Sequence, residues 1–66
     1  MSYIVGTKNK IYTLNHESLD EARRLAVFDS LHNPQKVFHV WTQKGGWNSE
    51  KRGTWLARYK AGKQVF

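Results

Sequence analysis

Cysteine is absent from this 66-residue sequence, and proline occurs only once. Without cysteine the chain can form neither disulfide bonds nor thiolate metal sites, which are two common ways of stabilising a very small domain. A domain of this length buries only about 60% of the surface of its unfolded chain, so its core is small. The three Trp, three Tyr and three Phe are the expected compensation, because large rings bury much area for each residue that is ordered.

Long apolar runs are also missing. No stretch approaches the roughly 20 apolar residues that a membrane-spanning helix needs. The first residues lack the basic start and the apolar run of a signal peptide. We therefore expect a soluble protein of the cytoplasm with no membrane partner, folded as a single domain over residues 1–66.

Catalytic motifs are scarce as well. The sequence contains no nucleophile elbow, no phosphate-binding loop and no glycine-rich segment between a strand and a helix. His16, His32 and His39 do not have metal-ligand spacing, and we interpret His39 as a half-buried packing residue within a strand. The sequence thus predicts a protein that is not an enzyme, has no catalytic residues and holds neither a metal nor a cofactor.

Acidic residues are rare in the second half of the chain. Residues 1–35 hold four basic and four acidic groups, whereas residues 36–66 hold seven basic groups against Glu50 alone. The net charge of +6 therefore arises in the second half. This asymmetry indicates an anionic partner, which would be nucleic acid, a nucleoprotein or an acidic protein surface. The alternative is a basic surface that only aids solubility.

The pattern of residues predicts an α+β fold in which one α-helix packs on a small antiparallel β-sheet, in the order β(β)αββ(β). Residues 3–5 form a short apolar strand, and residues 10–14 form a second strand or continue the first. Strands are also expected over residues 36–43 and 52–60, with a last short edge strand over residues 64–66.

The single helix is predicted over residues 19–31. Residues 18–21 read Ser-Leu-Asp-Glu, which is a capping box that begins a helix. Asn33 and Pro34 end it, because Asn suits the cap and Pro restricts the residue before it. An apolar face at helical spacing is expected from Leu19, Ala22, Leu25 and Ala26, with Phe28 at its edge.

Residues 52–60 contain both an aromatic anchor and positive charges. With a period of two, one side of this strand carries Trp55, Ala57 and Tyr59. The other side carries Thr54, Leu56, Arg58 and Lys60. We expect the aromatic side to pack on the helix, with the Trp55 ring buried, and the basic side to face solvent.

Two features are left open by the pattern. In residues 36–43, Val37, His39 and Trp41 alternate with Phe38, Val40 and Thr42, and either set suits the helix-facing side. Trp47 lies in the glycine-containing loop that follows. It either stacks on a partner or folds back to cover one end of the core.

Several short blocks resemble a known family. They are Tyr3-Ile4, the helix block from Ser18 to Ala26, Trp55-Leu-Ala57, Tyr59-Lys60 and Gly62-Lys63. In this order they resemble small phage-encoded anti-CRISPR proteins of the type I-F inhibitors. The chain differs from that pattern in a longer loop over residues 43–53.

The resemblance implies a stoichiometric inhibitor. Such a protein would bind the backbone Cas subunits of the RNA-guided CRISPR surveillance complex in the host cytoplasm and block the path of target DNA. By position, Arg23 and Arg24 on the helix and Lys60 and Lys63 near the end of the chain would contact the complex.

We therefore predict a small basic phage or mobile-element protein that inhibits a host nucleic-acid machine, the CRISPR complex or another host nucleoprotein. The alternatives are a small non-catalytic DNA- or RNA-binding module, with non-specific DNA binding, and an assembly protein of a virion. Basic residues interleaved with aromatics on antiparallel strands are typical of surfaces that bind single strands. The predicted partner-binding residues are Lys36, Trp47, Lys51, Arg52, Arg58, Lys60 and Lys63, together with Arg23 and Arg24.

Overall fold

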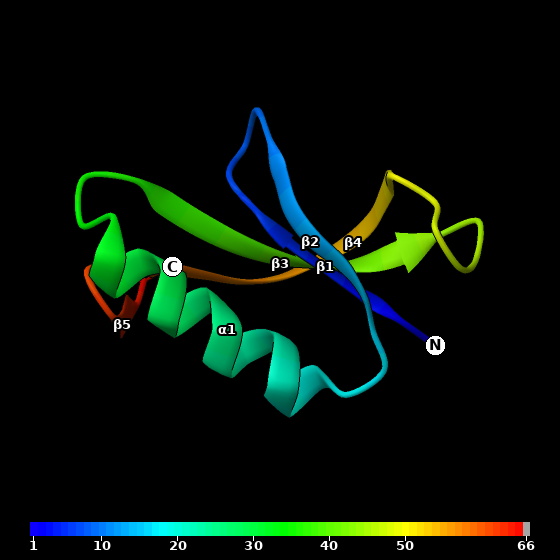
Figure 1. Ribbon diagram of the computed structural model, residues 1–66, viewed down its shortest axis with the longest axis horizontal. Helices are drawn as coiled ribbons and strands as arrows, with labels where there is room; N and C mark the ends of the chain where they lie inside the picture. The colour runs from blue at the N-terminus through cyan, green and yellow to red at the C-terminus, as the bar shows by residue number, and fades with distance from the viewer. Residues whose placement is uncertain (66) are drawn as a thin grey trace.

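The structure is a computed structural model, and it describes residues 1–65. One helix lies against one face of a five-stranded antiparallel sheet with the strand order β2-β1-β3-β4-β5 (Figure 1). The elements are β1 (Tyr3–Gly6), β2 (Ile11–His16), α1 (Leu19–His32), β3 (Val37–Lys44), β4 (Lys51–Lys60) and β5 (Lys63–Gln64). The predicted α+β fold class is confirmed. No helix in the described part of the chain is long and apolar enough to cross a membrane.

The helix begins and ends where its local sequence predicts. Ser18 adopts an extended backbone conformation, and its hydroxyl accepts a hydrogen bond from the Glu21 N–H at 3.3 Å. This bond satisfies one of the N–H groups that a helix N-terminus leaves without an intrahelical partner. At the other end, the backbone N–H and the side-chain amide of Asn33 both donate to the Asp29 carbonyl, at 3.0 and 3.1 Å.

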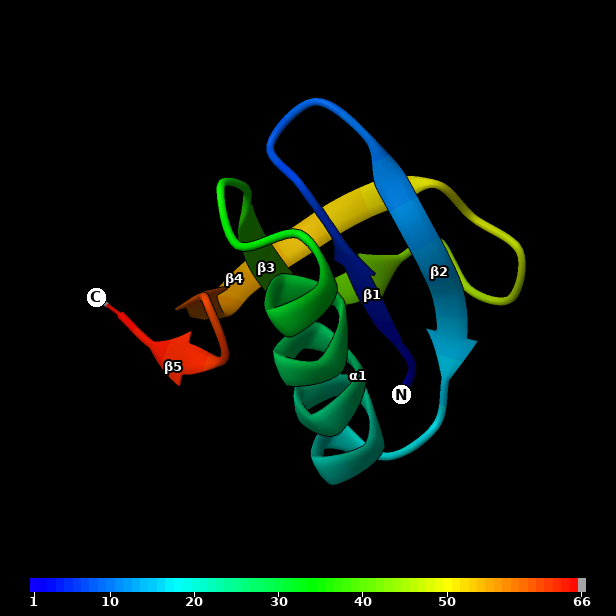
Figure 2. The same cartoon turned by 60° about the vertical axis from the view of Figure 1, so that its left-hand side comes forward.

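The core lies between the helix and the sheet. Its buried members come from four elements: Val5, Ala22, Ala26, Phe38, Val40, Ala57 and Tyr59. Because the helix contributes two alanines, its backbone can approach the sheet closely. Figure 2 shows α1 lying across the sheet, with β5 at its side.

The apolar face of the helix differs from the predicted one. Ala22 and Ala26 are buried and Leu19 packs against the core, as expected. The position that completes the buried face is a polar residue, Ser30, while Phe28 is 55% exposed. The alternation left open for β3 is also settled, because Phe38 and Val40 belong to the helix-facing core.

The predicted burial of Trp55 is wrong. Neighbouring Val40 and Trp41 of β3 pair with Ala57 and Trp55 of β4, so Leu56 is an extra residue and forms a β-bulge. The bulge shifts the alternation of β4 by one position. Ala57 and Tyr59 face the helix as predicted, whereas the Trp55 ring lies on the opposite side and is 44% exposed. Leu56 packs against the core instead.

The final strand is shorter than expected and covers little of β4. It pairs Lys63 and Gln64 with the last two residues of β4, and Phe66 lies outside the described residues. Over residues 51–57, the outer edge of β4 therefore pairs with no other strand in the described part of the chain. The unpaired edge of the sheet therefore belongs to β4, its most basic strand.

Candidate nucleic-acid interface

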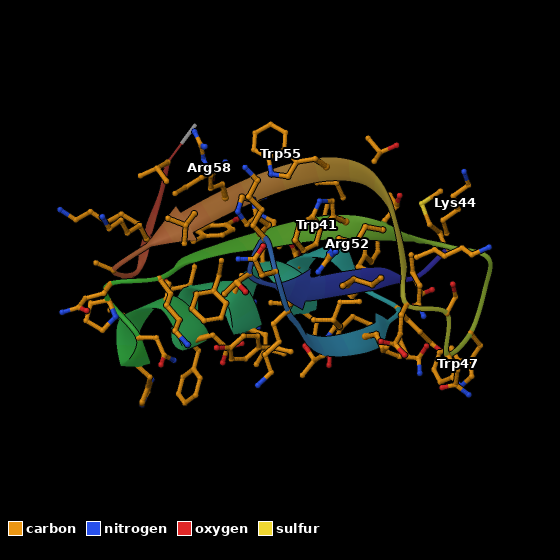
Figure 3. All side chains as sticks on the ribbon, turned by 90° about the horizontal axis from the view of Figure 1, so that it is seen from above. Trp41, Lys44, Trp47, Arg52, Trp55 and Arg58 are labelled. Atoms are coloured by element: carbon orange, nitrogen blue, oxygen red, sulfur yellow. The ribbon has the colours of Figure 1, made fainter. Side chains whose placement is uncertain are left out.

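The sheet face opposite the helix gathers aromatic and basic side chains, and we call it the open face. Seen from this side, Trp41 and Arg52 lie near the middle of the molecule, with Trp55 and Arg58 along β4 (Figure 3). Directly opposed residues of antiparallel strands project from the same face. His39 opposes Arg58 and Trp41 opposes Trp55, so β3 and β4 together build this surface.

Three aromatic rings on the open face form one connected cluster. The His39 and Trp41 rings are stacked, with centroids 5.1 Å apart and planes 22° apart. The indole N–H of Trp55 donates to Nδ1 of His39 at 3.2 Å. Trp41 is only 9% exposed and Trp55 is 44% exposed. Trp41 therefore lies at the base of the cluster, and Trp55 is the ring that the cluster exposes to solvent.

Two arginines lie over these rings. The Arg52 guanidinium carbon is 4.8 Å from the centroid of the Trp41 ring, and that of Arg58 is 5.9 Å from the centroid of the Trp55 ring. Both distances are within the range of cation–π attraction. The rings thus hold two positive charges on the open face, where several donors of each guanidinium can reach a phosphate.

A groove of about 940 Å³ runs from this cluster to the β1–β2 turn. The turn contributes Lys8 and Lys10, and Lys36 enters from the segment before β3. Lys36 Nζ donates to the Tyr12 hydroxyl at 3.2 Å, and Lys10 Nζ lies 5.3 Å from the Tyr12 ring centroid. No acidic side chain lines the groove among the described residues. The groove is therefore a strip of positive charge with aromatic rings in its floor.

The surroundings of His39 lower its pKa and so favour the neutral form of the ring. Burial lowers its pKa first, and the positive charges of Arg58, Lys8 and Arg52 lower it further. A neutral imidazole can accept the Trp55 N–H at Nδ1, which a doubly protonated ring cannot do. The same cations that prepare the groove for an anion thus also maintain the orientation of the Trp55 ring.

The predicted partner-binding residues divide into groups. Arg58 and Lys36 line the groove, and Arg52 lies over the Trp41 ring at its border. Lys60 opposes Val37 and so lies on the same face, at the end of β4, with Lys63 opposite it on β5. Lys51 lies at the far end of β4.

The two helix arginines are not part of this surface. The Arg23 side chain donates from Nε to the Tyr59 hydroxyl at 2.8 Å and from Nη2 to Gln64 at 3.2 Å. The bond to Tyr59 raises the pKa of Arg23, which stays charged. Arg24 lies beside Leu25 and Phe28 on the exposed side of the helix. Arg23 thus joins the helix to the sheet edge, and both arginines are separated from the groove by the sheet.

Trp47 is 61% exposed and does not belong to the core. Its loop is nevertheless pinned. The buried side-chain amide of Gln43 donates to Asn15 Oδ1 and to the Ser49 carbonyl, both at 2.9 Å. Asn15 Oδ1 also accepts the Asn48 N–H at 2.7 Å. Asn15 and Asn48 both have a φ of 66°, a left-handed conformation that Asn tolerates better than most residues.

Sequence reasoning missed four members of the open face: Lys8, Lys10, Trp41 and Trp55. The lysines belong to the charge-balanced half of the sequence, but the turn between β1 and β2 brings them to the groove. The available signal was the option that residues 10–14 form a second strand beside residues 3–5, which would place Lys8 and Lys10 at the turn between them. The described residues also contain no group of three or more His, Asp or Glu side chains that could hold a metal ion.

Comparisons with models of known protein families, with curated proteins and with solved structures found no match. The function proposed below is therefore based on the geometry and charge of the open face.

Proposed function

We propose that this chain is a non-catalytic binding protein that holds nucleic acid on its open face. The observation that carries the proposal is the gathering of Lys8, Lys10, Lys36 and Arg58 along one groove with an aromatic floor, and Arg52 adds a further charge over the Trp41 ring. Phosphate groups supply most of the affinity of nucleic acid for basic surfaces. Aromatic rings add stacking contacts with the bases, which a polyanion without bases cannot make.

A binding titration with labelled DNA and RNA at several salt concentrations tests this proposal. The logarithm of the affinity should fall linearly with the logarithm of the salt concentration, with a slope set by the number of phosphates contacted. Arg58→Glu should weaken binding by about tenfold or more, because it places a carboxylate in the groove. Circular dichroism would verify that the variant is folded.

Arg24→Glu is the matched control. It changes the net charge by the same amount, but Arg24 lies on the exposed side of the helix. Its affinity should stay close to that of the unchanged protein. Equal losses in the two variants would show that only net charge matters, and absence of binding to any nucleic acid would reject the proposal.

A second candidate function is the inhibition of a host nucleoprotein in the host cytoplasm, and Trp47 favours it. This ring is exposed outside the groove, on a loop held by the Asn15 and Gln43 side chains. Beside it is a hollow lined by Met1, Ser2 and Glu17. Exposed Trp residues are frequent hot spots of protein interfaces. A nucleoprotein such as the CRISPR surveillance complex, which the sequence resemblance suggests, would offer both nucleic acid and protein surfaces.

Capture from a host lysate, with and without nuclease, separates the two candidates. A protein partner that is retained after nuclease treatment and lost in Trp47→Ala supports the inhibitor. Capture that depends entirely on intact DNA or RNA supports the simple nucleic-acid-binding module.

A further inference from the structure

We propose that the open face takes single-stranded nucleic acid, with one unpaired base stacked on the Trp55 ring. This inference rests on the proposed function and assigns a ligand class and a central residue to it. The sheet presents one large ring to solvent here, since Trp41 beside it is covered by His39 and Arg52. The ligand therefore stacks one base at this position, and its phosphates lie on either side.

The Trp55 ring is placed outward by the backbone. The extra residue at Leu56 turns the Trp55 side chain away from the helix, although the simple alternation of the strand would bury it. Burying a tryptophan would add much to the stability of so small a core. An exposed ring at this position loses that contribution, and the bulges of natural sheets commonly redirect side chains at functional sites.

The orientation of the ring is fixed before any ligand arrives. Its N–H is bonded to His39 Nδ1 at 3.2 Å, and His39 is itself stacked on the buried Trp41. A ring held in this way loses little conformational freedom when a base stacks on it. His39 is therefore a positioning residue, which acts on the ligand through Trp55.

The charges around Trp55 suit the backbone of the same strand. The Arg58 guanidinium carbon is 5.9 Å from the ring centroid, and Arg52 lies on the neighbouring Trp41 ring. A nucleotide whose base stacks on Trp55 therefore has cations within reach of its own and the adjacent phosphates. The pairing of an aromatic platform with flanking cations is the common design of surfaces that bind single strands.

Duplex nucleic acid cannot use the ring in this way. Its bases are stacked on one another and present only their edges in the grooves, so a tryptophan face has no base to stack on. The lysines and arginines of the groove would still attract duplex phosphates. The Trp55 contribution is thus specific to unpaired bases, while the charge contribution is shared by both forms.

The test compares three labelled ligands bound to the full chain: a short oligothymidylate, the same strand annealed to its complement, and a strand of equal length that lacks bases. The unchanged protein should bind the oligothymidylate about tenfold more tightly than the base-free strand. Trp55→Ala should remove that difference and leave the affinity for the base-free strand unchanged. Trp47→Ala, which deletes the other exposed tryptophan, should leave the difference intact.

The positioning role of His39 has its own measurement. His39→Leu removes the acceptor for the Trp55 N–H, and His39→Asn keeps an acceptor near the same place. The preference for the oligothymidylate over the base-free strand should fall in His39→Leu and recover in His39→Asn. A loss of affinity that is equal for both strands in both variants would show a purely structural role.

The outcomes separate this inference from the proposed function. Equal affinity of the unchanged protein for the normal and base-free strands overturns base stacking, and this comparison needs no variant to fold. Equal weakening of both strands by Trp55→Ala overturns it as well. In either case salt-dependent binding that is lost in Arg58→Glu leaves the proposed function standing. Absence of binding to all three ligands overturns both.

Discussion

The hydroxyl of Ser30, within the helix, accepts a hydrogen bond from the backbone N–H of Gly62 in the β4–β5 turn at 2.8 Å. The same hydroxyl donates to the Val27 carbonyl at 2.8 Å, and Ser30 is fully buried. Ser30→Ala would leave the Gly62 N–H without its partner. We expect a loss of about 1–3 kcal/mol in the free energy of unfolding, measured by urea denaturation. Gln35→Ala, at an exposed position after the helix, should change stability by no more than about 0.5 kcal/mol.

The N-terminal cap of the helix gives a second prediction. Ser18→Ala should cost about 1 kcal/mol, because the Glu21 N–H loses its side-chain acceptor. Ser18→Asp should retain most of the stability, since a carboxylate also accepts this bond and suits the positive end of the helix. An unchanged melting temperature in Ser18→Ala would show that the cap contributes nothing.

The two tryptophans of the open face should differ in their effect on stability. Trp41 is 9% exposed, so Trp41→Ala should cost about 3–5 kcal/mol, enough to unfold a domain of this size. Trp55 is 44% exposed, and Trp55→Ala should cost clearly less and leave the protein folded. Thermal unfolding followed by circular dichroism distinguishes the two. Unfolding of Trp55→Ala would contradict the position of the bulge at Leu56.

Gln43 gives a fourth prediction, because its side chain joins the Trp47 loop to β2. Gln43→Leu would leave the Asn15 N–H and the Ser49 carbonyl without their side-chain partners. We expect a loss of about 1–3 kcal/mol in stability and faster hydrogen exchange at Asn15. Asn33 also makes a side-chain bond to backbone, but at the helix end. Asn33→Ala should therefore leave exchange at Asn15 unchanged.

Acidification should destabilise the protein through His39. Its pKa in the folded state is below the ordinary value of 6.5, so the unfolded chain binds the proton more readily. The contribution of His39 to stability is therefore fully present above pH 6.5 and is lost as the pH falls from there through the lower pKa of the folded state. His39→Gln should lose less stability between neutral pH and about pH 5, measured by urea unfolding.

Asp29 acts in the opposite direction and must be separated from His39. Burial raises its pKa above the ordinary value of 3.8, so its contribution is present in acid and is lost as the pH rises from there through the raised pKa. The difference between the unchanged protein and His39→Gln cancels this contribution. An identical pH dependence in the two proteins would contradict the role of His39.

The sequence allowed the helix to be located within one residue at each end, because its signals are local. Ser18 and Asn33 act on backbone groups three or four positions away. The orientation of Trp55 was not predictable in this way. It depends on the register between β3 and β4, because the extra residue at Leu56 puts Trp55 on the opposite side from the one that simple alternation with Ala57 predicts.

Only part of the candidate site was predictable, again because some of its members depend on long-range contacts. Arg52, Arg58 and Lys36 were found because positive charge accumulates in the second half of the chain. Lys8 and Lys10 were missed, because counting charge along the sequence cannot show that a hairpin brings them to the groove. Arg23 was expected at a partner interface, but its bond to Tyr59 depends on the packing of the helix against the sheet.

The open outer edge of β4 has a consequence for self-association. Over residues 51–57 its N–H and C=O groups face no other strand of the described chain, and such an edge is a template for pairing with another molecule. Lys51 and Arg52 stand at the start of this edge, and Lys60 and Lys63 lie beyond its other end, where β4 pairs with β5. Like charges on two approaching copies repel, so these residues oppose aggregation. Neutralising them should therefore increase aggregation at low salt, relative to the unchanged chain.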